Sequence, residues 1–434
     1  MKTEFDPRHA HAAPPARLRA GVRCAALVVA LALALPAAAV ETSILWSPTS
    51  GHGAELAYAL DVEGTELAIG APGENASTGA VYVADCATLP CSAPQRIVPG
   101  DIASGDAFGS AVGVSGDTLV ATAPGPEPGA AYVFVRSGSG WAQQARLAPG
   151  GGGTGERFGV SASLAGDRLA IGADRANGKA GAVYVFVRSG TAWTQEARLT
   201  ANDATARDAF GASVALDADT LIAGAPLKRS TGFGHYANGA AYVFTRGGGG
   251  WSQQAKLVAA TGANGDLFGF AVALDGDRAI VGAPYAASAR GTAYVFERTG
   301  TTWAQQAQLA AAGGAAGDEF GWSVALGDST IVIGAPFAGQ LAGTACGSSY
   351  VFDAVSIAET GGSIEAPAPN QLAGWSVAAS GPRWAVSAPG HVVGADDHAG
   401  AAYWFDPTIT IFHAGFDAPG ACVDLDEAVA LPAS

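Results

Sequence analysis

The sequence predicts an all-β protein, a seven-bladed β-propeller of four-stranded blades whose ring is closed by an N-terminal strand. One motif unit recurs seven times between residues 56 and 373, with a mean spacing of about 53 residues. Each complete unit contains four short apolar runs bounded by Gly and Asp, which is typical of β-strands. The first unit is preceded by a lone fourth run, and the last unit has only three runs. Four strands per repeat of this length indicate a propeller blade.

The composition agrees with a folded, repetitive β protein. Hydrophobic residues make up 49% of the 434 residues, which excludes a disordered chain. The 61 glycines follow no three-residue period, which excludes collagen. The 23 basic and 38 acidic residues give a net charge of −15, so we expect no nucleic-acid partner.

Residues 1–39 have the three parts of a secretory signal peptide. A polar segment with Arg17, Arg19 and Arg23 precedes the apolar run 25–35, and small residues follow it up to Ala39. We expect cleavage near Ala39; the alternative is an uncleaved anchor helix. The mature chain contains no later segment long and apolar enough to span a membrane. The predicted location is therefore secreted, periplasmic or at the cell surface.

The elements of the repeat follow one another in a fixed order. A Phe-Gly pair is followed by a Val-Ala-Leu run, a two-residue turn such as Gly276-Asp277, and a run that ends in Gly-Ala-Pro. An Ala-Tyr-Val-Phe run and a Trp-x-Gln-Gln-Ala-x-Leu run complete the unit. The Phe-Gly pairs begin at Phe108, Phe158, Phe210, Phe268 and Phe320, and degenerate copies lie at Leu56-Ala57 and Ala373-Gly374.

The two ends of the repeat region predict how the ring closes. The run Ile44-Leu45-Trp46 lies 11 residues before the first unit in the register of a fourth strand, and the last unit ends at Phe405. Joining them completes the seventh blade and removes an exposed sheet edge. The alternating segment 408–412 is the competing closing strand. We therefore expect a propeller over residues 40–405 and a C-terminal tail over 406–434.

Four cysteines remain after cleavage: Cys86, Cys91, Cys346 and Cys422. An even number in an exported chain favours disulfides, and three pairings are open. We favour Cys86 with Cys91, which closes a short loop. Cys346 with Cys422 would then connect the tail to the propeller.

These motifs resemble the FG-GAP repeat, which is found in the propeller of integrin α-subunits and in many bacterial exported proteins. The fullest matches are Phe268-Gly269 with Gly282-Ala283-Pro284, and Phe320-Gly321 with the corresponding Gly-Ala-Pro at 334–336. The resemblance covers about residues 41–405 and implies an adhesion-type interaction. Many members carry a DxDxDG calcium loop between the first two strands, but here a tight turn stands in its place. We therefore expect no calcium and no other cofactor.

The sequence shows no catalytic motif. Gly-x-Ser occurs at Gly321-Trp322-Ser323 and Gly374-Trp375-Ser376, but neither segment completes the nucleophile-elbow pattern. His391 and His398 flank Asp396-Asp397 in the last loop. A solvated loop is the favoured interpretation there, and a metal or ligand site with His391, Asp396 and Asp397 is the alternative. We predict no catalytic residue and no metal site.

An acidic residue recurs just before each Phe-Gly pair. A brace within its own loop is the favoured interpretation, and a rim that attracts cations or a basic partner is the alternative. The residues are Asp106, Glu156, Asp208, Asp266 and Asp318.

The loops after Ala-Pro differ in length between repeats, which is typical of a binding surface on a rigid scaffold. The longest runs from Leu227 to Asn238. Its candidate ligand-binding residues are Lys228, Arg229, Phe233, His235 and Tyr236.

These patterns predict an exported, monomeric, non-enzymatic binding or adhesion scaffold that presents its loops to a protein or glycan. One alternative is an enzyme that uses a propeller face to hydrolyse or eliminate polysaccharide. The other is a structural component of the cell surface.

Overall fold

The computed structural model describes residues 42–45, 54–125, 128–153, 155–229, 237–339, 345–360, 364–365, 371–390 and 400–406. The chain divides into two units, 1–38 and 39–434, and every described residue belongs to the second unit. The predicted signal peptide, the competing strand at 408–412 and the tail from residue 407 lie outside the described residues.

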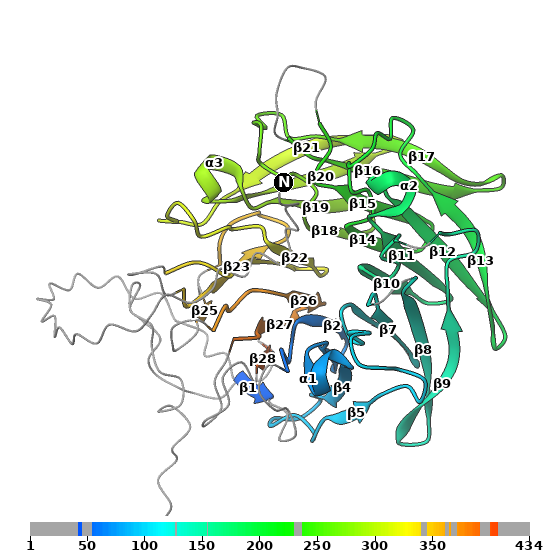
Figure 1. The fold of residues 1–434 in the computed structure, drawn as a ribbon. Coiled ribbons are helices and arrows are strands. Elements are labelled where there is room, and N and C mark those ends of the chain that lie inside the picture. The colour runs from blue at the N-terminus through cyan, green and yellow to red at the C-terminus, as the bar shows by residue number, and fades with distance from the viewer. Residues whose placement is uncertain are drawn as a thin grey trace, which may run out of the picture. The chain divides into compact units, whose positions relative to one another are not determined.

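The described residues form seven antiparallel sheets of four strands each, and Figure 1 shows these sheets arranged in a ring. The predicted seven-bladed propeller is therefore confirmed. We number the blades from 1 to 7 along the chain.

Each blade is built in the same order from the centre of the ring outward. The first strands are β2 (Ala59–Glu63), β6 (Val112–Ser115), β10 (Ser161–Ala165), β14 (Ser213–Asp217), β18 (Val272–Asp275), β22 (Ser323–Leu326) and β26 (Val377–Ser380). The second strands are β3 (Glu66–Ala71), β7 (Thr118–Ala123), β11 (Arg168–Ala173), β15 (Thr220–Ala225), β19 (Arg278–Ala283), β23 (Thr330–Ala335) and β27 (Arg383–Ala388). The third strands are β4 (Ala80–Asp85), β8 (Ala130–Ser137), β12 (Ala182–Ser189), β16 (Ala240–Gly247), β20 (Thr292–Thr299), β24 (Ser348–Asp353) and β28 (Ala401–Phe405). The fourth strands are β5 (Gln95–Ile97), β9 (Gly140–Leu147), β13 (Ala192–Leu199), β17 (Gly250–Leu257), β21 (Thr302–Leu309), β25 (Ile364–Glu365) and β1 (Thr42–Leu45).

The seventh blade combines strands from both ends of the repeat region. β1 pairs antiparallel with β28, with Thr42 opposite Phe405 and Leu45 opposite Ala402. The strand order in this sheet is β1-β28-β27-β26. A segment that precedes the first blade thus supplies the outer strand of the last one.

The Phe-Gly and Gly-Ala-Pro motifs meet where neighbouring blades touch. A Cβ atom placed on Gly224, the first residue of one Gly-Ala-Pro, would lie 1.9 Å from the carbonyl oxygen of Gly269 in the next blade's Phe-Gly pair. A Cβ atom placed on Gly172 would lie 2.0 Å from the carbonyl oxygen of Gly211. Backbones this close leave no room for a side chain, so glycine is required on the Gly-Ala-Pro side. Gly269 itself has φ +89, which also favours glycine.

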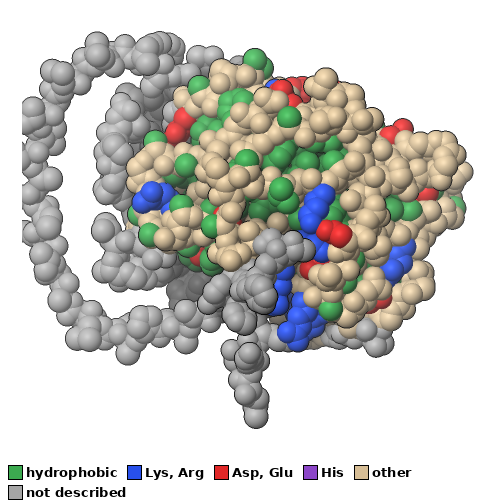
Figure 2. Space-filling model, turned by 90° about the horizontal axis from the view of Figure 1, so that it is seen from above, with side chains coloured by type: hydrophobic (Ala, Val, Ile, Leu, Met, Phe, Trp, Pro, Cys, Tyr) green, Lys and Arg blue, Asp and Glu red, His purple; other side chains and the backbone are tan. Residues whose placement is uncertain are grey.

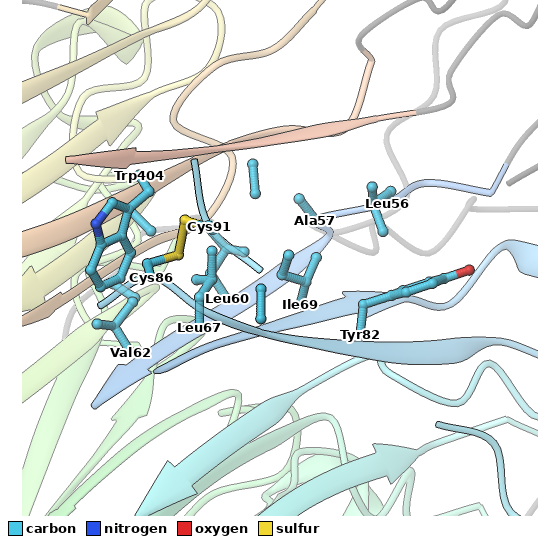
Figure 3. Close-up of a cluster of buried hydrophobic side chains, with 14 of the residues drawn as sticks. Leu56, Ala57, Leu60, Val62, Leu67, Ile69, Tyr82, Cys86, Cys91 and Trp404 are labelled. Atoms are coloured by element: carbon cyan, nitrogen blue, oxygen red, sulfur yellow. A yellow bond between two sulfur atoms is a disulfide. The ribbon is translucent and has the colours of Figure 1, made fainter. Parts of the chain in front are cut away.

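The phenylalanine of the motif anchors a hydrophobic core between each pair of blades. Phe268, 1% exposed, packs against Tyr294 and Phe296 of its own blade with ring centroids 5.4 and 6.0 Å apart. One core cluster lies at each of the seven contacts between blades, including the contact between blades 7 and 1. Figure 3 shows this last cluster, in which Trp404 of blade 7 and Leu60 of blade 1 are buried together.

The outer strands are linked by the tryptophan and glutamine of the fourth run. Trp193 donates its indole N–H to Gln144 Oε1 of the preceding blade at 2.8 Å, and Trp303 donates in the same way to Gln254 at 2.8 Å. The repeated Trp-x-Gln-Gln sequence is therefore explained by a bond from blade to blade.

The predicted local disulfide between Cys86 and Cys91 is confirmed, and it lies in the core between blades 7 and 1. Cys346 is also disulfide-bonded and is 3% exposed. Cys422, the partner predicted for Cys346, lies outside the described residues.

Three short helical segments occupy loops between second and third strands: α1 (Glu74–Ser77), α2 (Ala176–Lys179) and α3 (Ala286–Ala289). Figure 2 shows one side of the molecule, on which the charged side chains are few among uncharged ones. The low charged fraction of the sequence, 14%, is consistent with this view.

Candidate functional site: the two ends of the central axis

The first strands surround the axis of the ring and give it two different ends. Each first strand starts at a Phe-Gly corner and ends at the tight turn that leads to the second strand. We call the end with the corners the Phe-Gly face and the end with the turns the hairpin face. Candidate sites lie at both.

A cavity of about 610 Å³ opens at the hairpin face and is lined by residues from all seven blades. Its acidic lining comes from Asp61, Glu63, Asp217, Asp275 and Asp328. Serines contribute the other polar side chains, with Ser115, Ser163 and Ser380.

Many of these polar side chains hold one blade to the next. Asp61 Oδ2 accepts the backbone N–H of Val114 at 2.7 Å, and Asp217 Oδ2 accepts that of Gly276 at 2.7 Å. Ser115 and Ser380 accept the N–H groups of Gly166 and Gly64 in the same way, and Ser163 accepts that of Leu216. We call these contacts axial latches. Among the described residues, no such latch at this face joins blade 6 to either neighbour.

Burial and like charge shift the pKa values of the acids in this cavity. Burial raises the pKa of Asp61 to about 7, although the bond from Val114 favours the ionised form. Burial also raises the pKa of Asp275, and the nearby carboxylates of Asp328 and Asp217 add to that shift. Asp61 is thus partly protonated at neutral pH.

The Phe-Gly face carries an aromatic cluster over blades 5, 6, 7 and 1. We define it as Tyr58, Phe270, Tyr285, Trp322, Phe337 and Trp375. Each of these residues has a ring contact with another member or lies in the same apolar cluster. Tyr58, Phe270, Trp322 and Trp375 each follow the Phe-Gly pair or its equivalent, and Tyr285 and Phe337 each follow a Gly-Ala-Pro. At the first of these positions, blades 2, 3 and 4 have Ser110, Val160 and Ala212.

Trp322 lies at the centre of this cluster. It is 7% exposed, and its ring centroid lies 4.7 Å from that of Phe270, 4.9 Å from that of Trp375 and 5.5 Å from that of Phe337. Tyr58, Tyr285, Phe337 and Trp375 remain partly exposed. The buried indole therefore supports rings that reach the surface.

A carboxyl group lies at the edge of the aromatic cluster. Glu319 and Tyr285 share a side-chain hydrogen bond, and burial raises the pKa of Glu319 to about 7. Burial, together with the charge of Glu319, raises the pKa of Tyr285 to about 12. Glu319 Oε2 has no hydrogen-bond partner among the described residues.

The recurrent acids each bond within their own loop. Asp106 and Asp266 accept the backbone N–H groups of Ala103 and Ala263 at 2.8 and 2.6 Å. Glu156, Asp208 and Asp318 accept those of Gly153, Thr205 and Ala315. Four of the five acids are buried, the exception being Asp106, which is half-buried. They brace the loops that lead into the Phe-Gly corners.

Of the candidate residues in the longest predicted binding loop, the structure describes Lys228 and Arg229. Lys228 is 5% exposed, and its ammonium lies 2.8 Å from Asp208 Oδ2. Its charge is therefore committed to a buried ion pair rather than offered to a ligand. Arg229 is exposed. Phe233, His235, Tyr236, His391, Asp396 and Asp397 lie outside the described residues.

Metal-binding clusters and membrane-spanning helices are both absent from the described residues. No group of three or more His, Cys, Asp or Glu side chains in this part of the chain is arranged to hold a metal ion. No helix within the described ranges is long and apolar enough to cross a membrane.

Motif searching misses the aromatic cluster because its signal is a departure from the repeat. As a motif, Gly-Trp-Ser at 321–323 and 374–376 indicates only an incomplete nucleophile elbow. Aligning the residue after each Phe-Gly pair would reveal the cluster, since that residue is aromatic in blades 5, 6, 7 and 1 and small in blades 2 to 4.

Three comparisons relate the chain to known proteins, and one of them identifies its family. No curated protein matches the chain. The crystal structure of Sqt1 from Saccharomyces cerevisiae is similar at 9% sequence identity and a TM-score of 0.45, and the match covers 83% of this chain and 100% of that one. The family model for the FG-GAP repeat matches residues 92–134, 141–186, 193–244, 251–296 and 303–352. With five matched repeats over more than half of its length, the chain belongs to the FG-GAP repeat family.

Proposed function

We propose that this chain is an exported, non-enzymatic binding or adhesion scaffold whose Phe-Gly face recognises a protein or a glycan. One observation carries the proposal. Positions that pack the blades together recur around the ring, whereas the residue after Phe-Gly changes from small to aromatic in four adjacent blades. A repeat protein retains packing residues in every copy, so a local departure that leaves aromatic rings partly exposed is better explained by recognition.

The loops around this cluster support the same face. The second-to-third-strand loops follow Gly-Ala-Pro and therefore lie at the Phe-Gly face, and their lengths differ between blades. Variable loops on a rigid scaffold commonly carry binding residues. Export is the expected role of residues 1–39, and N-terminal sequencing of the mature protein tests it.

The test is capture of ligands by the immobilised mature chain from a glycan array and from extracellular protein mixtures. In one variant, residues 230–236 are replaced by a short turn, while Lys228 is kept because its removal would leave Asp208 without its buried partner. The matched control is Gly248→Ser with Gly249→Ser, in a two-residue turn that follows a third strand and lies at the hairpin face, where added side chains meet open space. We expect loss of capture in the first variant only, with unchanged melting temperatures in both.

The opposite result would redirect the proposal. Unchanged capture in the first variant and loss in the control would move recognition to the hairpin face. Release of new reducing ends or unsaturated sugars from a polysaccharide by the intact chain would replace the scaffold with the enzymatic alternative.

A further inference from the structure

We propose that the aromatic cluster is a sugar-binding site that takes the flat, apolar face of a neutral pyranose ring. This inference rests on the proposed function and specifies its ligand class. It is argued from the rigidity of the cluster, the orientation of its rings, its size and its polar edge.

The cluster is rigid before any ligand arrives. Trp322 is buried and contacts Phe270, Phe337 and Trp375, so the rings that reach the surface are held from below. Aromatic side chains lose little conformational entropy when they bind, and packing from beneath lowers that loss further. The surface is therefore preorganised.

The rings form a curved row around the axis. The interplanar angles are 46° between Phe270 and Trp322, 47° between Trp322 and Trp375, and 49° between Trp375 and Tyr58. These angles are close to one seventh of a turn, about 51°, which is the rotation between blades of a seven-bladed ring. Each blade thus presents the next ring at a regular step. Phe270 and Trp322 are the buried part of the row, and Trp375 and Tyr58 are the partly exposed part, so the row offers two adjacent ring surfaces to a ligand.

The size of the exposed surface favours a small ligand over a protein. Tyr58, Tyr285, Phe337 and Trp375 are each exposed by about a third at most. With about 150–250 Å² per aromatic side chain, the exposed rings amount to about 300 Å² or less. A stable protein interface buries about 800 Å² on each partner. One or two sugar rings match the smaller area.

The chemistry of the cluster selects a neutral sugar. The C–H groups on the flat face of a pyranose carry slight positive charge and pack well on the negative face of an aromatic ring. Tyr285 and Glu319, which bond to each other, place a hydroxyl and a carboxyl at the edge of the cluster, where sugar hydroxyls need donors and acceptors. Apolar rings with a few polar groups are typical of small-ligand sites. The nearest acid and the net charge of −15 disfavour an anionic sugar.

The experiment measures binding of a panel of neutral gluco-, xylo-, manno- and galacto-oligosaccharides to the mature chain by calorimetry. Saturation-transfer NMR identifies which sugar protons lie against the protein. Trp375→Ser and Tyr58→Ser each install the residue that blade 2 has at the same repeat position, Ser110. The control is Trp141→Ser, which changes a partly exposed tryptophan of an outer strand. Choline and a lysine-rich peptide are titrated in parallel.

We expect at least one oligosaccharide to bind, with saturation of its ring C–H protons. Its Kd should rise at least tenfold in Trp375→Ser and several-fold in Tyr58→Ser, and should not change in Trp141→Ser. The variants are compared only where thermal melting shows that they are folded. Because Tyr58 contacts the cluster only at its end, its variant keeps the test valid if Trp375→Ser does not fold.

Other outcomes separate this inference from the proposed function. If a sugar binds equally well to both cluster variants, the site is wrong although the scaffold proposal stands. If choline or the peptide binds at the cluster and no sugar does, the ligand class is wrong. If neither this panel nor the capture experiment yields a ligand, both proposals fail.

Discussion

In blades 1 to 4, the third-strand tyrosine lies opposite a basic side chain of the fourth strand, and a carboxylate completes the group. Tyr242 donates to Asp203 at 2.7 Å, and Lys256 bonds the same carboxylate at 2.6 Å. In blade 5 the residue opposite the corresponding tyrosine, Tyr294, is the neutral Gln308. The pairs in blades 1 to 4 are Tyr82 with Arg96, Tyr132 with Arg146, Tyr184 with Arg198, and Tyr242 with Lys256.

The side-chain contacts at the axis also differ between the early and the late blades. Axial latches join blade 7 to blade 1 and each following pair up to blades 4 and 5. Among the described residues, blade 6 has no latch at the hairpin face, and in addition to its two cores with the neighbouring blades it is packed through Trp322 at the Phe-Gly face. We call blades 1 to 4 the latched half and blades 5 to 7 the aromatic half. The backbone contacts between glycines recur in both halves, so they define the fold. The side chains at the axis can therefore differ between blades without loss of the fold.

The largest expected effect is the loss of the central indole. Trp322→Ala removes a buried side chain that three rings contact, and we expect the free energy of unfolding to fall by about 4 kcal/mol. The matched change in the other half is Val160→Ala at the same repeat position, with an expected loss of about 2 kcal/mol. Urea unfolding followed by circular dichroism measures both. Equal losses would show that the aromatic cluster has no special role in holding blade 6.

The second effect separates a buried ion pair from a simple loop brace. Asp208→Ala leaves the ammonium of Lys228 buried without its nearest carboxylate, and we expect a loss of about 3 kcal/mol in the free energy of unfolding. Asp318→Ala removes only a bond from a backbone N–H in blade 6, with an expected loss of about 1 kcal/mol.

The double variant Asp208→Ala with Lys228→Met checks the physical reason. Replacing the buried ammonium of Lys228 by the apolar side chain of methionine should restore most of the stability that Asp208→Ala loses. If the double variant is as unstable as Asp208→Ala alone, the loss comes from the loop brace and not from the lost ion pair with Lys228.

The sequence predicts the fold well because close backbone contacts require glycine at the same positions of successive repeats. Gly224 and Gly269 are glycines since their backbones nearly touch, and this requirement appears in the sequence at a fixed spacing. The same holds for the turn glycines and the local disulfide, whose partners are close along the chain.

The candidate site is less visible in the sequence because its residues come from four blades and share no motif. Nothing along the chain places Tyr58 beside Trp375, since they are far apart in sequence and the ring brings their centroids to 5.7 Å. Its place in a variable loop predicts that Lys228 is a surface residue. Its role depends instead on Asp208, a residue of the preceding loop, with which it forms a buried ion pair. Such contacts become predictable only when the repeats are superposed in register.

The last effect compares the pH dependence of two acids, Asp61 at an axial latch and Glu319 beside the aromatic cluster. Both have pKa values raised to about 7 in the folded chain from ordinary values of 3.8 and 4.5. Between the ordinary and the raised pKa, the folded chain keeps a proton that the unfolded chain has lost. Stability should therefore fall as pH rises from about 5 to 7, by about 1.4 kcal/mol per pH unit for each group, and level off above pH 7.

Asp61→Asn and Glu319→Gln test each contribution separately. The amide oxygen introduced by Asp61→Asn can still accept the N–H of Val114, so the substitution removes the charge and keeps the latch. Denaturant unfolding at several pH values should show a shallower slope in either variant and the shallowest in the double variant. A slope that changes only in Glu319→Gln would mean that the bonded carboxylate of Asp61 is ionised throughout. In that case its bond to Val114 outweighs its burial, and the latched half of the ring tolerates buried charge better than the aromatic half.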